Sequence, residues 1–166
     1  MKVIIFSDSH DSIKNIDSAF SLIEREGIES DYLIHCGDIC SLETLSHIAN
    51  LWRGEIHFCF GNMDGDGFAI PQSNSIFKKV YLHGGEFGQL EIGGKKIAFQ
   101  HFPEVAQNLA GSGDWDAVFY GHTHKRHSEY IGKTLLANPG TVSGIKHSAS
   151  FAVYSSDDSS LDFIEI

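Results

Sequence analysis

The chain has 166 residues, which fits one domain, and we expect residues 1–166 to fold as a single unit. Its 22 acidic and 12 basic residues give a formal net charge of −10, and the basic residues are scattered, so long nucleic acid is not an expected partner. No apolar run approaches the roughly 18 residues of a membrane helix, so we expect a cytoplasmic protein with no membrane contact.

The amino-terminal half is predicted to alternate strands and helices. The β-branched run Lys2–Phe6 is typical of a buried strand. Apolar residues then recur at helical spacing from Ile13 to Ile23, where Asp11 or Ser12 can cap the start and Gly27 can end the helix. The next predicted elements are a strand over 32–35, a helix over 41–50 and a strand over 55–60. This alternation favours a parallel sheet with right-handed crossovers.

The carboxyl-terminal half is predicted to be rich in short strands. Residues 63–75 combine Gly, Asp, Ser and Asn without a sustained period, so we expect a loop there. One helix is predicted from about Pro103 to Gly111, and Gly93-Gly94 is typical of a hairpin turn. The predicted strands cover 80–83, 87–92, 95–100, 116–120, 130–131, 134–137, 151–154 and 161–164. We therefore expect an α/β protein with two stacked mixed sheets and helices on their outer faces.

Three cysteines lie in otherwise apolar segments: Cys36, Cys40 and Cys59. Their number is odd and none has Cys-x-x-Cys spacing, which argues against disulfides or a zinc site. We predict reduced thiols in the core.

Potential metal ligands follow the carboxyl ends of the predicted strands. In open α/β sheets ligands bind at that edge, so loops far apart in sequence can converge there. Two pairs are spaced i and i+2, which in an extended chain turns both side chains to one side. The predicted ligands are Asp8, His10, Asp38, Asn62, His101, His122 and His124. Seven oxygen and nitrogen ligands are enough for two metal ions.

The ligand types indicate which metals would bind. Carboxylate, carboxamide and imidazole without thiolate favour two divalent ions from the group Mn²⁺, Zn²⁺, Fe²⁺ and Ni²⁺. Two ions about 3.5 to 4 Å apart need a bridging carboxylate, and they can hold a hydroxide between them for attack on phosphorus. Asp38 is the natural bridge. With two carboxylates in the set, the loaded site would carry a charge near +2 and attract phosphate.

Taken singly, several of these residues also have ordinary structural explanations. Asp8 could cap the following helix, although Asp11 and Ser12 can do so instead. Asp38 and Asn62 each follow a glycine and could be turn residues. A lone histidine at the end of a strand, such as His101, is often half-buried and satisfied. The order in which the motifs occur favours ligation for the whole set.

The other histidines stay outside the predicted ligand set. His35 could contact the bridging carboxylate or simply pack within its strand. The remaining ones have no partner spacing, and we predict them at the surface or at sheet edges: His47, His57, His83, His127 and His147.

The ordered motifs Asp-x-His, Gly-Asp, Gly-Asn, His and Gly-His-x-His run over nearly the whole chain and resemble the calcineurin-like metallophosphoesterases. The nearest likeness is to small single-domain prokaryotic phosphodiesterases. The resemblance implies a four-layer α/β/β/α sandwich with a dinuclear centre, near which Asn138-Pro139-Gly140 would lie. The implied ligands are Asp8, His10 and His124 for one ion, and Asn62, His101 and His122 for the other, with Asp38 bridging.

Two positions depart from the pattern of relatives. Met63 follows Asn62 where many relatives carry a histidine that protonates or positions the leaving group, so a general acid is missing there. The small phosphodiesterase branch lacks that histidine too, and Asp64 is expected to orient Asn62. Pro103 stands where relatives often carry the second histidine of His-Gly-His, so one contact to metal or substrate is lost.

Residues and resemblance together predict a metal-dependent phosphodiesterase for nucleotide-like or other small phosphodiesters. In this hypothesis a hydroxide between two ions attacks phosphorus, while Asn62, the histidines and the ions stabilise the developing charge. Asp38 and Asn62 are the predicted catalytic residues, and Asp64 is predicted to assist by orienting Asn62. The alternatives are a phosphomonoesterase, or a non-catalytic scaffold, because the retromer small subunit resembles the same fold and binds protein partners. A homo-oligomer is left open.

Overall fold

The computed structural model describes residues 1–64 and 78–166. The loop predicted over 63–75 therefore lies almost entirely outside the described residues. The first half contains β1 Lys2–Phe6, α1 Ile13–Arg25, β2 Tyr32–His35, α2 Leu42–Leu51 and β3 Glu55–Phe58. The second half contains β4 Val80–Leu82, β5 Gly88–Ile92, β6 Lys95–Phe99, α3 Pro103–Ser112, β7 Ala117–Phe119, β8 His127–Ile131, β9 Thr134–Asn138, β10 Ser150–Ser155 and β11 Leu161–Glu165.

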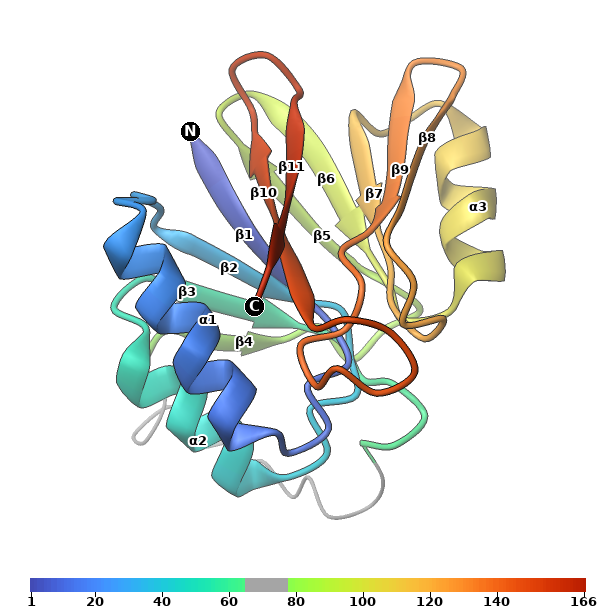
Figure 1. Cartoon of the computed structure of the whole chain (residues 1–166). Coiled ribbons are helices and arrows are strands. Elements are labelled where there is room, and N and C mark those ends of the chain that lie inside the picture. The colour runs from blue at the N-terminus through green and yellow to red at the C-terminus, as the bar shows by residue number, and fades with distance from the viewer. Residues whose placement is uncertain (65–77) are drawn as a thin grey trace.

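The strands form two mixed sheets, as predicted (Figure 1). The first sheet has the order β11-β10-β1-β2-β3-β4, in which β1 to β4 run parallel and β10 pairs antiparallel with β1. The second has the order β5-β6-β7-β9-β8, with β6, β7 and β9 parallel between antiparallel edge strands. Parallel strands in the middle of both sheets direct their following loops to one side of the molecule.

Three buried layers hold the sheets and helices together. Alternate residues of β1 divide between two of them, because successive side chains of a strand point to opposite faces. Ile5 packs between the sheets against residues such as Phe99 of β6. Ile4 faces outward and packs in the cluster that contains Ile16 of α1. On the other outer face, Ala106 of α3 lies in a cluster with β7 and β9. The predicted four-layer α/β/β/α sandwich is thus confirmed, with α1 and α2 on one side and α3 on the other (Figure 1).

Element ends follow the predicted residues with small differences. Gly93 and Gly94 have φ of 58° and 74°, which suits the tight turn between β5 and β6. Ser12 is the N-cap of α1, but its side chain makes no cap hydrogen bond. Asp11 does not cap α1 either, because its carboxylate accepts hydrogen bonds from the Ser41 and Thr44 hydroxyls at the start of α2, each at 2.6 Å.

None of the helices in the described ranges is long and apolar enough to cross a membrane.

Two predictions about single residues are wrong. Cys36 and Cys59, which directly follow β2 and β3, are buried, but Cys40 lies further along the loop after β2 and is only half-buried. His57 is not at the surface: it points inward from β3 and is 5% exposed. Its ring nitrogens lie 3.1 Å from His83 and 3.1 Å from the Glu55 carboxylate, and these contacts satisfy it there.

Replacing Ile5 by Ala should test the layer between the sheets. Ile5 is fully buried, so the lost methyl groups leave a cavity and should lower the free energy of unfolding by about 2 to 5 kcal/mol. Ile13→Ala is the matched control, because Ile13 is 38% exposed and its truncation should cost less than about 1 kcal/mol. Urea denaturation of the two variants measures both, and equal losses would contradict this description of the core.

Candidate metal centre

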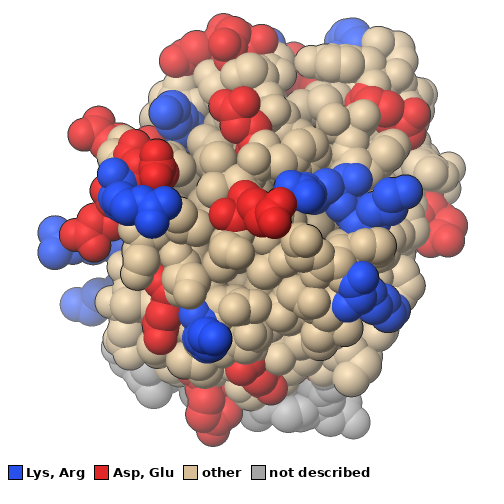
Figure 2. Space-filling view, viewed as in Figure 1, with Lys and Arg blue, Asp and Glu red and all other residues tan. Residues whose placement is uncertain are grey.

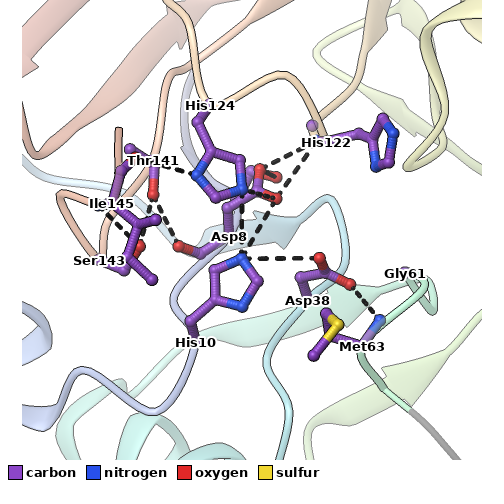
Figure 3. Close-up of polar contacts among 12 residues, drawn as sticks. Asp8, His10, Asp38, Gly61, Met63, His122, His124, Thr141, Ser143 and Ile145 are labelled. Atoms are coloured by element: carbon purple, nitrogen blue, oxygen red, sulfur yellow. Dashed lines mark hydrogen bonds and ion pairs between the residues drawn. The ribbon is translucent and has the colours of Figure 1, made fainter. Parts of the chain in front are cut away.

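The predicted ligands lie on five loops, each of which follows a parallel strand. Asp8 and His10 follow β1, Asp38 follows β2 and Asn62 follows β3, all in the first sheet. His101 follows β6, and the His122/His124 pair follows β7, in the second sheet. The structure brings all seven side chains together at the edge where both sheets end, and Figure 3 shows those around Asp8 and Asp38.

Three of these side chains form a first cluster, made of Asp8, His10 and His124. The His124 Nε2 atom lies 3.3 Å from Asp8 Oδ1 and 3.2 Å from His10 Nε2. The third side of the triangle, from His10 Nε2 to Asp8 Oδ1, is 3.8 Å. Two atoms that each ligate one ion at about 2.1 Å are separated by about 3 to 3.5 Å. The donor atoms of the first cluster are therefore spaced closely enough to share an ion.

A second cluster contains Asn62, His101 and His122. Asn62 Oδ1 lies 3.0 Å from His101 Nε2 and 2.8 Å from His122 Nδ1. The two ring nitrogens lie 3.2 Å from each other. This cluster also has the spacing of three ligands of one ion.

The Asp38 carboxylate lies between the two clusters. Its Oδ2 atom is 3.6 Å from His10 Nε2 in the first cluster and 3.5 Å from His101 Nε2 in the second. Its other oxygen accepts the Met63 N–H at 2.8 Å, which fixes the orientation of the carboxylate. An oxygen in this position can contact ions in both clusters, as the bridge of a dinuclear site must.

Two of the histidines are locked by backbone carbonyls. The Nδ1–H of His101 donates to the Cys36 oxygen at 2.8 Å, and that of His124 donates to the Ile145 oxygen at 3.0 Å. A neutral imidazole with its proton on Nδ1 keeps a free lone pair on Nε2. In both rings Nε2 is the atom that faces the clusters, which is the arrangement expected of metal-binding histidines.

The backbone at the site is strained. Both i, i+2 pairs were expected to be extended, and that prediction is wrong. The left-handed residues are Asp8, His10, Asp38, His122 and His124, with φ of 52°, 41°, 57°, 69° and 61°. A non-glycine residue in this conformation costs about 1 to 2 kcal/mol. Such strain persists where the surrounding structure fixes the backbone, commonly at functional sites. Here Asp8 N–H bonds to Gly37 O and His10 N–H to Asp38 O, both at 3.0 Å.

Two glycines allow the loops to approach each other closely. A Cβ atom at Gly61 would overlap the Asp38 carboxylate, and one at Gly121 would overlap the Ser7 hydroxyl. The glycines that precede Asn62 and His122 are therefore required by packing between loops.

Asp64 contacts the backbone of two loops at the site. Its carboxylate accepts three backbone N–H groups, from Asp38 at 2.7 Å, Cys40 at 2.7 Å and Gly61 at 2.8 Å. None of these contacts is with the Asn62 side chain, but Gly61 directly precedes Asn62, and the role of Asp64 in orienting Asn62 stays a prediction. Asp64 joins the loop after β2 to the loop after β3.

Sequence reasoning missed the roles of two polar residues near the end of β9. Asn138 lies near the site, as the resemblance implied, and its amide donates to the Gly121 oxygen at 2.7 Å, which holds the loop that carries the His122/His124 pair. The Thr141 hydroxyl donates to the backbone carbonyl oxygen of Asp8 at 2.9 Å. Both side chains are fully buried. A polar residue at the end of an apolar strand was the available signal for Asn138.

Burial and charge at the site favour a bound cation. Asp8 is fully buried, and burial alone would raise its pKa, but hydrogen bonds with His124 and Ser7 and the charges of His101 and His124 lower it overall. The hydrogen bond with Asp8 in turn raises the pKa of His124. A cation bound between these side chains would offset the charge of the buried Asp8 carboxylate. His35 bonds to Ser9 at 3.0 Å, and burial lowers its pKa to about 4.

Replacing Gly121 by Ala should disturb the site through one added methyl group. Overlap with Ser7 and a 2.8 Å approach to the Asp8 carboxylate should cost about 1 to 3 kcal/mol of stability and weaken Mn²⁺ binding. Gly111→Ala is the matched control, because that helical position has nothing within 4 Å and should gain about 0.5 to 1 kcal/mol. Urea denaturation and Mn²⁺ titration test both, and an unchanged Gly121 variant would be evidence against this packing.

Comparison with known proteins agrees with this geometry. Residues 1–159 match the family model of the calcineurin-like phosphoesterase superfamily domain. Phosphodiesterase MJ0936 of Methanocaldococcus jannaschii is 34% identical over 146 residues, which cover 87% of this chain and 86% of that protein. A solved structure of an archaeal phosphodiesterase superposes with a TM-score of 0.86 at 28% identity, over 100% of both chains.

A more distant solved structure shares the fold alone. Vacuolar Protein Sorting 29 of Cryptosporidium parvum superposes with a TM-score of 0.65 at 19% identity, over 99% of this chain and 96% of that one. The family match, the curated relative and the two clusters at the sheet edge lead to one conclusion: this chain belongs to the calcineurin-like phosphoesterase superfamily.

Proposed function

We propose that this protein is a metal-dependent phosphodiesterase that acts on small phosphodiesters. The observation that carries the proposal is the position of Asp38 Oδ2, 3.6 Å from a histidine of the first cluster and 3.5 Å from one of the second. The 34% identical relative named a phosphodiesterase supports the same activity.

The clusters would hold two divalent ions from the group Mn²⁺, Zn²⁺, Fe²⁺ and Ni²⁺. Asp8, His10 and His124 would hold one, Asn62, His101 and His122 the other, and Asp38 would contact both. These donors fit such ions, because they combine carboxylate, carboxamide and imidazole without thiolate. The chemistry that bound ions supply is polarisation of the phosphoryl oxygens and activation of a water molecule.

The side of the site that is open to solvent is the second cluster. Asn62 and His122 are exposed, whereas Asp8, His101 and His124 are at most 6% exposed. A phosphate group would therefore approach from the side of Asn62 and His122. Asn62 turns its Oδ1 toward the two histidines, and no described residue accepts a hydrogen bond from its amide N–H₂, which can donate to a phosphoryl oxygen. That hydrogen bond strengthens as negative charge develops on the oxygen during the reaction.

Two of the histidines and the carboxylate of Asp38 are fixed before substrate arrives. Carbonyl oxygens hold the rings of His101 and His124, and the Met63 N–H holds Asp38. Groups that need no rearrangement stabilise the transition state without a reorganisation cost. The strained loops keep these side chains in position.

Met63 favours diesters over monoesters with poor leaving groups. Its side chain is 56% exposed beside Asn62 and has no proton to give, so it cannot act as a general acid at this position. A phosphomonoesterase that handles alkyl substrates would need such a group. We therefore place the phosphomonoesterase second.

The geometry of the site argues against the scaffold alternative. A scaffold has no need for seven ligand side chains in contact, five of them on strained backbone.

On the face drawn in Figure 2, basic side chains form small groups among acidic ones and do not merge into one continuous surface. With a net charge of −10, this distribution supports a small substrate over long nucleic acid.

Removal and return of metal should control the activity. Chelator-stripped protein should lose hydrolysis of bis(p-nitrophenyl) phosphate, and Mn²⁺, Ni²⁺, Zn²⁺ or Mg²⁺ added singly should restore it to different degrees. The same series with p-nitrophenyl phosphate compares diester with monoester, and the diester should be hydrolysed faster. Activity that survives chelation, or a monoester preference, would contradict the proposal.

Asp38→Ala and His122→Ala should each abolish most of the diester hydrolysis while the fold is kept. We expect kcat/KM to fall by at least about 100-fold, since even partners that only orient a metal ligand are worth about 10- to 100-fold. His47→Ala is the matched control, because His47 pairs with Asp17 on α1, at 2.7 Å, and has no contact with the clusters. Circular dichroism checks the fold of each variant, and full activity in either site variant would refute the assignment.

A further inference from the structure

Cys40 lies beside His10, on the side of the ring that faces away from the first cluster. Its Sγ atom is 3.4 Å from His10 Nδ1. The other ring nitrogen, Nε2, faces the cluster and lies 3.2 Å from His124 Nε2. The thiol is thus the outer partner of one ligand of the proposed metal site.

This contact differs from those of the other locked histidines. His101 and His124 donate their Nδ1–H groups to backbone carbonyls, which no substitution removes. His10 has a side chain in the same position, and sulfur is a weaker acceptor than a carbonyl oxygen. The orientation of His10 therefore depends on the identity of residue 40.

The direction of this hydrogen bond determines whether His10 can ligate. If the ring proton is on Nδ1 and donates to sulfur, Nε2 keeps its lone pair for an ion. If the thiol donates to Nδ1, the proton of the neutral ring is on Nε2 and blocks ligation. Only the first arrangement is compatible with His10 as a ligand.

The backbone holds the thiol in this position. Cys40 has a φ of 81°, a left-handed conformation that is unfavourable for a non-glycine residue. Its N–H donates to Asp64 at 2.7 Å, and the same carboxylate accepts the N–H of the bridging residue Asp38. One buried group therefore places both the bridge and the outer partner of His10.

We propose that Cys40 is a positioning residue for His10: its sulfur accepts the Nδ1–H and keeps Nε2 directed at the ion of the first cluster. The inference rests on the proposed function, because it concerns one of the two proposed ions. It predicts an effect on one metal-binding step and not on the other.

The test is a stepwise titration of chelator-stripped protein with Mn²⁺ by calorimetry, and with Co²⁺ followed by visible absorption. Cys40→Ala should weaken one of two binding steps by roughly 10- to 100-fold and alter the Co²⁺ spectrum of that ion. Cys40→Ser keeps an acceptor and should recover most of the loss. His10→Ala should lose the same step, which identifies it as that of the first cluster.

Cys59→Ala is the matched control, since it removes a buried thiol, 4% exposed, that packs between the sheets. It should leave both binding steps unchanged. Thermal unfolding of the metal-free variants checks that Cys40→Ala and Cys40→Ser fold equally well.

The outcomes separate this inference from the proposed function. If wild type binds two ions and hydrolyses the diester while Cys40→Ala binds both ions equally well, the role of Cys40 alone is refuted. That role is also refuted if both steps weaken together, or if Cys40→Ser recovers nothing. If wild type binds no ion, the proposed function is overturned and this inference with it.

Discussion

The arrangement of the site depends on the buried Asp64 carboxylate. Its two oxygens accept backbone N–H groups from Asp38, Cys40 and Gly61, which belong to loops after two different strands. Hydrogen bonds from N–H groups to a carboxylate are stronger than those between neutral groups, and burial shields them from water. These contacts fix the positions of Asp38, Cys40 and Gly61 relative to one another.

The metal centre contains strain that the rest of the fold must offset. Five of the proposed ligand residues adopt left-handed backbone conformations, which cost up to about 1 to 2 kcal/mol for a non-glycine residue. The large buried cluster between the sheets supplies the opposing free energy, because it removes many aliphatic and aromatic side chains from water. Both sheets are therefore needed: each contributes proposed ligands, and their mutual packing keeps the strained loops in place.

The charge of the proposed site with its ions bound differs in sign from the net charge of the chain. The chain carries a formal charge of −10, yet the site combines two carboxylates with four histidines and one amide. Two divalent ions would reverse the sign locally, so that a phosphate is attracted to the edge of the sheets and not to the surface in general. Local charge and access through Asn62 and His122 are consistent with a small anionic substrate.

The sequence alone determined the architecture and the composition of the site. Strands and helices follow from apolar periodicity, and the position of each motif after a strand implied a common edge, because parallel strands end on the same side. The sequence did not determine how the loops are held. Asp64, Asn138 and Thr141 act on backbone groups far along the chain, and the left-handed conformations at Asp8 and Asp38 arise from contacts between loops. The location of Cys40 next to His10 and the burial of His57 were likewise decided by tertiary structure, since spacing along one strand or loop carries no information about the neighbouring ones.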